Sequence, residues 1–411
     1  MNSGDTAWVL VSSSLVMLMT PALGLFYGGM VERKNLLSAL MLSFATLLVV
    51  TIQWVMCGYS LSFGPDLGHL IGGSAWFGLQ AIMTSTNSVY AATIPHMAYM
   101  LFQMKFAIIT PALIFGAIID RVRFLSWIAF VLLWTTFIYD PVAHWVWGEG
   151  GWLRALGSLD FAGGTVVHIT SGVAALAMCI ALRKKKRAVD GRFIPDSVPL
   201  TLFGAVLLWF GWFGFNGGSA LSANTIAVQA LVTTNVAAAV AALTWIGLSY
   251  LNGKGPTAVG TATGAVVGLV AITPACGYVN VYASMIIGGI GAIVSFYSIK
   301  LAERMRIQDS LDVCACHGMA GTWGSLAVGL FASKAINPQG SDGLIHGNWH
   351  LLVAQMITVS IVWGFTFCGT FVLARLVDVV LHFTASTEEQ ERGLDVIHYG
   401  DIIVEELAEA S

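Results

Sequence analysis

The sequence predicts an all-α polytopic membrane protein with eleven transmembrane helices, built as two five-helix repeats of inverted topology and a final helix. Three observations support this fold class: an apolar composition, a series of long apolar segments, and an uneven distribution of lysine and arginine. Of the 411 residues, 57% are hydrophobic and only 10% are charged, whereas soluble domains carry about 25% charged residues. This composition excludes a soluble multidomain protein, and the lipid bilayer is the expected environment.

Charge and cysteine content narrow the class further. The formal net charge is −3, from 19 basic and 22 acidic residues, so the chain offers no strongly basic surface and we expect no nucleic-acid partner. The six cysteines are scattered, and we predict no disulfide framework. The segment Met1–Asp5 lacks the basic residues of a cleaved signal peptide, so the first apolar segment is expected to remain as a span.

The predicted spans follow from the thickness of the bilayer. A hydrocarbon core of about 30 Å takes about 20 helical residues, and polar or Gly/Pro-rich breaks divide the chain into segments of this length. The eleven predicted spans are residues 7–30, 36–63, 96–119, 124–146, 161–182, 198–219, 225–251, 257–275, 279–301, 311–332 and 350–382. We therefore predict a transmembrane domain over residues 1–382. Residues 383–411 form a cytoplasmic tail that is either regulatory or the start of a linker to a further domain.

The basic residues predict the orientation, because short cytoplasmic loops retain lysine and arginine. Loops after even-numbered spans hold only Arg154 and Lys334. The loops after odd-numbered spans, the inner end of the last span and the tail together hold sixteen basic residues. They are Arg33, Lys34, Arg121, Arg123, Arg183, Lys184, Lys185, Lys186, Arg187, Arg192, Lys254, Lys300, Arg304, Arg306, Arg375 and Arg392. We therefore predict a multi-pass protein of the plasma membrane with its N-terminus outside and its C-terminus in the cytoplasm.

Two histidines predict the internal repeat. His168 follows Asp160 by eight residues in the fifth span, with the aspartate at the outer end, and His317 follows Asp309 by eight residues in the tenth span, with the aspartate at the inner end. A match of this kind with opposite orientation is typical of inverted-topology repeats. At about 1.5 Å per residue, both histidines approach the middle of the membrane. A single membrane histidine often serves only as an interhelical hydrogen-bonding residue, but two at equivalent positions favour a functional pair. Asp160 is interpreted first as a helix cap.

Aromatic residues give a weaker signal. In the sixth span, one helix face carries the spacing i, i+4, i+7, i+11, and in the third span Phe102 and Phe106 are an i, i+4 pair. Trp147 lies at a predicted outer interface, where tryptophan is common as an anchor. Each aromatic residue taken alone is more typical of packing than of a site. The residues of the sixth-span face are Leu208, Trp212, Phe215 and Ser219.

Six sequence blocks are distinctive when taken together. They are Gly24-Leu-Phe-Tyr-Gly-Gly-Met30, Phe102-Gln-Met-Lys-Phe106, Ala143-His-Trp-Val-Trp147, Asp160-Phe-Ala-Gly-Gly-Thr-Val-Val-His168, Trp209-Phe-Gly-Trp-Phe-Gly-Phe-Asn-Gly-Gly-Ser219 and Asp312-Val-Cys-Ala-Cys-His-Gly318. In this order they resemble the ammonium transporter family, specifically the Amt branch of the Amt/Rh proteins, over nearly the whole chain. The fourth and fifth blocks are the most specific.

We expect no enzymatic activity, cofactor or metal, and the resemblance implies a homotrimer of eleven-helix subunits with one narrow pore each. It also implies a role for each matching residue. The outer ammonium site is Trp147, Phe106 and Ser219; the gate is Phe106 and Phe215; the pore and proton relay are His168, His317, Trp212 and Leu208; and Asp160 supports the outer site.

These residue types suit ammonium chemistry. Aromatic faces attract a cation by about 0.5–2 kcal/mol, and a hydroxyl can accept one of the directed hydrogen bonds that ammonium donates but potassium does not. An apolar pore penalises the ion far more than neutral ammonia. The mechanism that the resemblance implies is recruitment and deprotonation of ammonium, passage of ammonia, and separate proton movement through the histidine pair.

Two features depart from the family pattern. Lys105 directly precedes Phe106 at a position where the family ordinarily has an uncharged residue, so it is a candidate modulator of the pore. A charge near the gate would repel ammonium, and the alternative is a side chain that turns into an interhelical polar pocket or outward. In the tail, Gly393-Leu-Asp395 fits the start of the family's regulatory tail, whereas a heptad-like helix from Ile402 fits less well.

These departures leave alternatives open. The first is an Amt-like ammonium sensor with little or no transport, coupled through the tail to a fused or associated signalling domain. The second is an intramembrane enzyme that uses the histidine pair or a metal held by Cys314, Cys316 and His317. We disfavour this alternative because neighbouring residues on one helix point in different directions and do not surround a metal ion. The resemblance also implies a PII-type regulator at the cytoplasmic face.

Overall fold

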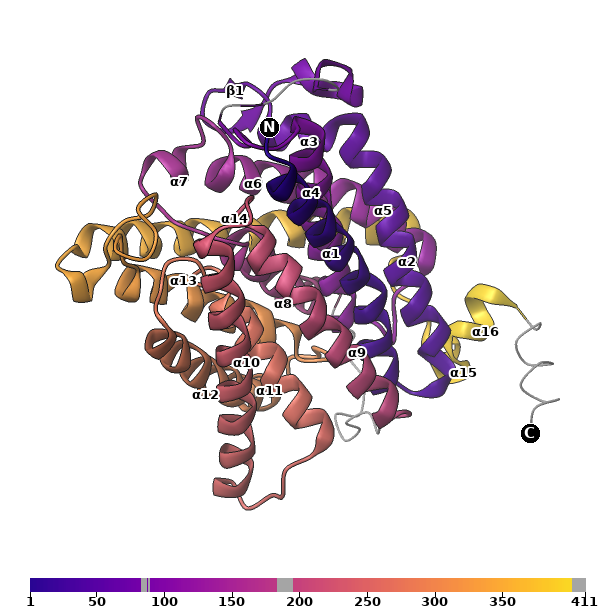
Figure 1. The fold of residues 1–411 in the computed structure, drawn as a ribbon. Helices are drawn as coiled ribbons and strands as arrows, with labels where there is room; N and C mark the ends of the chain where they lie inside the picture. Colours follow the sequence, from indigo (N-terminus) through magenta and orange to yellow (C-terminus); the bar gives the residue numbers. More distant parts are fainter. Residues whose placement is uncertain (83–86, 88, 183–194, 401–411) are drawn as a thin grey trace.

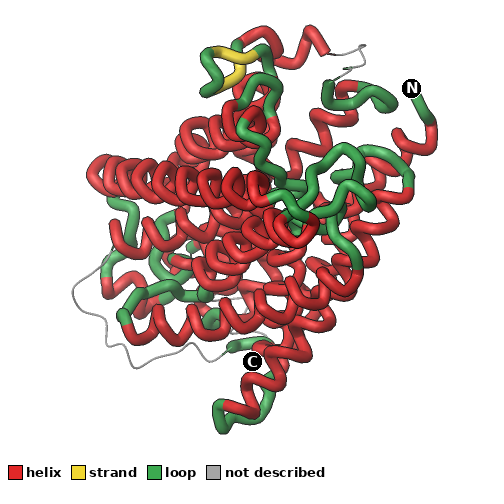
Figure 2. The backbone as a smooth tube through the Cα atoms, turned by 90° about the vertical axis from the view of Figure 1, so that its left-hand side faces the viewer, coloured by secondary structure: helices red, strands yellow, loops and turns green. Residues whose placement is uncertain are grey.

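The computed structural model describes residues 1–82, 87, 89–182 and 195–400, and most of them are helical (Figure 1). Figure 2 shows a single small hairpin of strands at one end of the described bundle, formed by β1 (Asp66–Leu67) and β2 (Ile71–Gly72). The α-helices are α1 (Ser3–Met30), α2 (Leu36–Gln53), α3 (Tyr59–Phe63), α4 (His96–Ile114), α5 (Phe124–Trp134), α6 (Asp140–Trp147), α7 (Trp152–Ala155), α8 (Thr170–Ala181), α9 (Val198–Trp212), α10 (Thr225–Leu251), α11 (Ala258–Ile272), α12 (Val281–Arg304), α13 (Ala320–Phe331), α14 (Trp349–Leu381), α15 (Thr387–Arg392) and α16 (Leu394–Tyr399). Tighter 3₁₀ turns are η1 (Arg33–Asn35), η3 (Ser74–Ile82), η4 (Phe115–Ala117) and η9 (Leu344–His346).

Five wider π-helical turns lie between helical segments or at the ends of helices, and two of them carry the predicted histidines. They are η2 (Trp54–Gly58), η5 (Thr135–Tyr139), η6 (Gly164–Ile169), η7 (Phe213–Gly217) and η8 (Cys314–Met319) within the described chain. Such turns add a residue to the helical repeat and are often found at functional sites. Side chains beyond such a turn therefore lie on a different side of the helix from the one that a regular helical repeat would predict.

The described chain contains nine helices that are long and apolar enough to cross a membrane. They agree with nine of the predicted spans to within a few residues at most ends; the prediction of residues 225–251, for example, coincides with α10. The predicted span 257–275 corresponds to α11, an apolar helix that is shorter than the others, and the span 311–332 corresponds to η8 and α13, which are not among the nine. The count of eleven spans therefore stays a prediction.

The bundle has two distinct ends. The N-terminus, the β hairpin and α7 lie at one end, and the tail helices α15 and α16 lie toward the other (Figure 1). We call these the outer and inner ends, following the predicted orientation, which itself stays a prediction. Six of the sixteen residues that support it lie within 183–194, outside the described residues.

Asparagine residues define where four long helices begin. The first N–H groups of a helix have no partner within the helix, and an asparagine oxygen just before the helix can accept from them. Asn2, Asn224, Asn280 and Asn348 accept such bonds at the starts of α1, α10, α12 and α14. The chain thus begins these helices without leaving their first donors unsatisfied.

Close packing of α1 against α9 positions one wall of the bundle interior. A Cβ atom added at Gly204 would lie 2.4 Å from the backbone nitrogen of Phe26, and one added at Gly211 would lie 2.2 Å from Cγ of Met19. Small residues therefore allow the two helices to approach closely, as in other membrane proteins. This contact directs Met19 and Phe26 toward the interior.

The first part of the tail is docked on the inner end. The carboxylate of Asp395 accepts hydrogen bonds from the backbone N–H groups of Leu37 (2.9 Å) and Ser38 (2.6 Å) at the start of α2. Glu389 and Arg123 form an ion pair at 2.7 Å. The hydrogen bond from Arg123 lowers the pKa of Glu389 to about 2. The heptad-like helix predicted from Ile402 lies outside the described residues.

Candidate functional site

The two predicted histidines meet inside the bundle. Nδ1 of His168 and Nδ1 of His317 are 3.3 Å apart, and the ring centroids are 5.4 Å apart with an interplanar angle of 26°. Both side chains are buried. A hydrogen bond between two imidazole nitrogens requires one donor and one acceptor, so this geometry fits one proton between the rings.

Two glycines allow this approach. A Cβ atom added at Gly172 would lie 2.0 Å from the backbone nitrogen of Gly318, so no larger residue fits there without moving the backbone. Gly172 is one turn beyond His168, and Gly318 directly follows His317. The contact of α8 with η8 therefore sets the separation of the two imidazoles.

Asp160 caps the segment that carries His168. Its Oδ1 atom accepts from the N–H groups of Gly163 and Gly164, and its Oδ2 atom accepts from those of Thr165 and Val166, at 2.7–3.0 Å. The position of the carboxylate agrees with its first interpretation as a cap.

The equivalent aspartate makes a similar set of bonds. Asp309 accepts from the N–H groups of Val313 and Cys314, ahead of His317. In both segments an aspartate therefore caps a π-helical turn that carries the histidine; the internal repeat itself stays a prediction.

Asp160 is also connected to the predicted outer site. The indole Nε1 of Trp147, in α6, donates to the backbone carbonyl of Asp160 at 2.9 Å. Gly163 has φ of +111°, and a Cβ atom there would lie 3.4 Å from Trp147. The loop that Asp160 holds in place thus fixes the orientation of the Trp147 ring.

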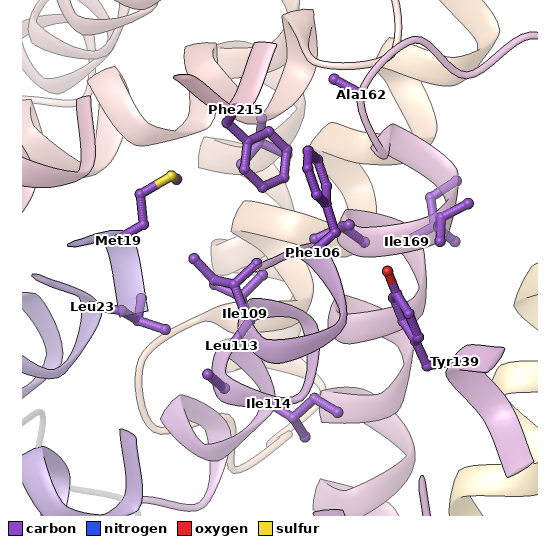
Figure 3. Packing of buried hydrophobic residues seen from close by; sticks show 14 of the residues in the cluster. Met19, Leu23, Phe106, Ile109, Leu113, Ile114, Tyr139, Ala162, Ile169 and Phe215 are labelled. Atoms are coloured by element: carbon purple, nitrogen blue, oxygen red, sulfur yellow. The ribbon is translucent and has the colours of Figure 1, made fainter. Parts of the chain in front are cut away.

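Three aromatic rings form a cluster beside Trp147. The centroid of Phe106, in α4, is 5.9 Å from that of Trp147, 4.3 Å from that of Phe215 and 4.9 Å from that of Phe102. Figure 3 shows the rings of Phe106 and Phe215 side by side. The structure therefore brings together the residues predicted as the outer site and the gate.

Ser219 joins this cluster one helical turn beyond Phe215. Its hydroxyl donates to the backbone carbonyl of Phe215 at 2.8 Å, and the residue is half-buried. Because the hydroxyl proton is used in that bond, the lone pairs of the oxygen remain available to accept a hydrogen bond from a ligand.

A narrow cavity of about 10 Å³ lies beyond Phe215. Both histidines line it, as do Leu208 and Trp212, and the ring of His168 stacks on Trp212 with centroids 5.5 Å apart. The indole of Trp212 donates to Thr273 at 2.9 Å, which holds the ring in place. The rest of the lining is apolar: Met19, Leu23, Phe26, Ile109, Leu113, Val167, Phe215 and Val266.

Residues of the inner loops line a second cavity of about 530 Å³. His317, Phe26 and Val266 line both cavities, so His317 lies where the narrow cavity meets this inner vestibule. The sequence did not predict Phe26 or Val266 as lining residues. The signal for Phe26 was its place in the block Gly24–Met30, which contributed only to the resemblance.

Lys105 has no acidic partner among the described residues. It lies in α4, is 8% exposed, and its Nζ atom is 3.8 Å from Sδ of Met104. The described residues also contain no group of three histidine, cysteine, aspartate or glutamate side chains arranged to hold a metal ion.

Comparison with known proteins gives matches over nearly the whole chain. The model of the Ammonium Transporter Family matches residues 7–403. An ammonium transporter of Bacillus subtilis (strain 168) is 45% identical over 402 residues, which are 98% of this chain and 98% of the relative. The crystal structure of Mep2 from Candida albicans has a TM-score of 0.89 and 35% identity, covering 95% of this chain and 88% of the other. A structure described as a sensor Amt protein has a TM-score of 0.88 and 29% identity, covering 97% and 98%.

Proposed function

Because the chain belongs to the ammonium transporter family, we propose that it recruits ammonium at an outer aromatic and serine site, removes a proton, and passes ammonia through a narrow apolar pore. The observation that carries this proposal is an unbroken series of ring contacts from Trp147 to His317. Successive centroids are 5.9 Å (to Phe106), 4.3 Å (to Phe215), 5.9 Å (to His168) and 5.4 Å (to His317) apart. The series leads from a half-buried tryptophan to a histidine that borders the inner vestibule.

Recruitment uses the aromatic cluster and the hydroxyl. The faces of Trp147 and Phe106 attract a cation by about 0.5–2 kcal/mol, more as water is excluded. Ser219 accepts a directed N–H bond from ammonium, which potassium cannot donate. Together the two interactions favour ammonium over a spherical cation of similar size.

The gate formed by Phe106 and Phe215 excludes the ammonium ion and admits neutral ammonia. Phe106 and Phe215 lie 4.3 Å apart between centroids, and the cavity beyond them has room for about one water molecule. Desolvation of a charged ion there costs far more than desolvation of ammonia. Ammonium therefore gives up its proton to the histidine pair, and neutral ammonia passes Phe215.

The histidine pair carries the proton separately. With Nδ1 atoms 3.3 Å apart, one imidazole can donate while the other accepts, and the pair titrates as a unit. Proton and ammonia rejoin in the inner vestibule. The net result is charge movement that depends on both imidazoles.

The assembly and topology belong to the same proposal. We expect a homotrimer in the plasma membrane, with the N-terminus outside, a transmembrane domain over residues 1–382 and a cytoplasmic tail over 383–411. Large apolar side chains are exposed on the long helices, for example Phe44 (53%), Leu243 (68%) and Val372 (63%), which suits contact with lipid or a second subunit. Docking of Asp395 on α2 supports a regulatory tail, and the inner loops beside it are the expected surface for a PII-type regulator.

The relatives favour transport over sensing. The relative at 45% identity is named a transporter, whereas the structure described as a sensor matches at 29% identity. We therefore do not retain the sensor alternative.

The test is a rapid ammonium concentration jump on proteoliposomes that contain the purified protein. The proposal predicts a saturable charge movement that an equal jump in potassium does not evoke. Protein-free liposomes serve as the control, and a signal no larger than theirs would refute transport.

A further inference from the structure

Lys105 is a buried lysine that the proposed mechanism does not use. The residue is 8% exposed, and the ion pairs among the described residues all join other groups. Its Nζ atom contacts Sδ of Met104 at 3.8 Å, a weak acceptor. A buried charge without a carboxylate partner carries a free-energy cost. Its position therefore calls for an explanation in terms of function.

The face of α4 that carries Lys105 leads into the narrow cavity. Ile109 and Leu113 follow Lys105 at i+4 and i+8, so all three lie on one side of the helix. Ile109 and Leu113 both line the narrow cavity. Figure 3 shows them on the side of α4 that faces Met19 and Leu23 of α1. Lys105 thus lies one turn above the cavity wall, beside the gate residue Phe106.

Along this face of α4, the solvent exposure of the side chains falls near Lys105, where the buried part of the pore begins. Met97 and Leu101, two turns and one turn before Lys105, are partly exposed, whereas Ile109 and Leu113 are only 2% and 3% exposed. Side chains on a helix lean toward its N-terminus. The start of α4 lies next to the outer loops, because His96 contacts Trp76 with ring centroids 4.8 Å apart. The Lys105 side chain therefore leans toward the outer side of the gate.

Among the described helices packed most closely on α4, none forms an ion pair with Lys105. Among the described elements packed most closely on α4, namely α1, α2, α8 and η4 to η6, the one acidic side chain is Asp5 in the first turn of α1. Its carboxylate accepts the N–H group of Ala223 at 2.9 Å. The other titratable groups on these elements are Tyr27, Tyr139, His168 and Cys179, none of which is an anion in its ordinary state.

We propose that Lys105 is a fixed positive charge at the neck of the pore that sets the affinity for ammonium and restricts passage to neutral ammonia. The inference rests on the proposed function, since it concerns the same site. A charge beside Phe106 repels ammonium held between Phe106 and Trp147, and it repels any cation that moves toward Phe215. Ammonia carries no net charge and is not held back. Lys105 thus opposes the entry of any cation into the pore, whereas the aromatic rings and Ser219 attract ammonium and distinguish it from potassium.

The test compares three variants with the native protein. Lys105→Met removes the charge at similar length, Lys105→Arg keeps a charge that proteins do not neutralise, and Lys334→Met removes an exposed lysine from an outer loop as a matched control. Ammonium-evoked charge movement in proteoliposomes gives the half-saturating concentration, and a potassium jump reports cation leak. Ammonium binding followed by tryptophan fluorescence gives affinity without transport. Elution profile and thermal unfolding confirm that each variant is folded.

The expected result is a half-saturating concentration and a dissociation constant about tenfold lower in Lys105→Met, together with a potassium current that the native protein lacks. Lys105→Arg and Lys334→Met should match the native protein. Unchanged affinity and no potassium current in Lys105→Met would overturn the inference, as would a change confined to Lys105→Arg. If no protein conducts ammonium, the proposed function fails, and the binding measurement still decides the role of Lys105.

Discussion

Nδ1 of His168 lies 3.3 Å from Nδ1 of His317, although the two residues are 149 positions apart in the chain. Each histidine follows an aspartate that caps its own π-helical turn. The two turns meet where Gly172 contacts Gly318. The distance between the two imidazoles therefore depends on the two capped turns and on the contact between the two glycines.

Replacement of Gly172 by alanine tests that dependence. The added Cβ atom would lie 2.0 Å from the nitrogen of Gly318, so the two helical segments must separate. We expect a loss of stability of about 1–3 kcal/mol and loss of most ammonium-evoked charge movement. The thermal unfolding midpoint and the proteoliposome signal are the measurements. Gly364→Ala is the control, because a Cβ atom there meets nothing within 4 Å; equal behaviour of the two variants would contradict the account.

Asp160 is expected to be required for the outer site through its cap. Asp160→Ala leaves four backbone N–H groups without their acceptor, and we expect a loss of at least about 3 kcal/mol of stability. Since Trp147 donates to the carbonyl of residue 160, ammonium binding should weaken as well. Thermal unfolding and tryptophan fluorescence report the two effects. The exposed Asp196→Ala variant should show neither, and native affinity in Asp160→Ala would remove this residue from the site.

Loss of the Ser219 hydroxyl should reduce discrimination against potassium. Ser219→Ala removes an acceptor for ammonium while the aromatic rings stay in place, so we expect about tenfold weaker ammonium affinity. Potassium contacts an oxygen atom without a directed hydrogen bond, so its affinity should fall by less than that of ammonium. Competition between the two ions for binding is the measurement. Ser14→Ala is a matched control, because Ser14 makes the same type of bond to the carbonyl four residues earlier, on the exposed side of α1.

Acid should release the docked tail. The hydrogen bond from Arg123 holds the pKa of Glu389 at about 2, below its ordinary value of 4.5. A lowered folded-state pKa stabilises the docked state above pH 4.5, and this contribution disappears as the pH falls from 4.5 toward 2. Hydrogen exchange of the backbone in α15, expressed relative to the intrinsic exchange rate at the same pH, should therefore rise over this interval in the native protein. The Glu389→Gln variant should lack that rise, and identical pH profiles would show that the ion pair does not hold the tail.

Local patterns predicted much of the fold. Apolar length placed the nine long helices, because a lipid environment requires runs of apolar residues whatever their tertiary contacts. The i, i+4 spacing of Phe102 and Phe106 predicted a shared face, and their ring centroids are 4.9 Å apart. Asp160 was predicted as a cap from its place before a helix, and it accepts four backbone bonds.

Other features depend on contacts between distant segments. The π-helical turns at His168 and His317 have no periodic signature, since a regular repeat assumes 3.6 residues per turn. The contribution of Met19 to the cavity depends on how closely α9 approaches α1, and docking of Asp395 joins residues more than 350 positions apart. Residue spacing along one segment contains no information about such distances.

The most direct test of the central claim measures ammonium uptake and charge movement together in proteoliposomes that contain either the native protein or His168→Ala. If the imidazole pair carries the proton, the native protein moves charge with ammonium, and His168→Ala loses that charge movement. His346→Ala, which changes an exposed histidine, should behave as the native protein does. An undiminished ammonium-evoked charge movement in His168→Ala would contradict the account.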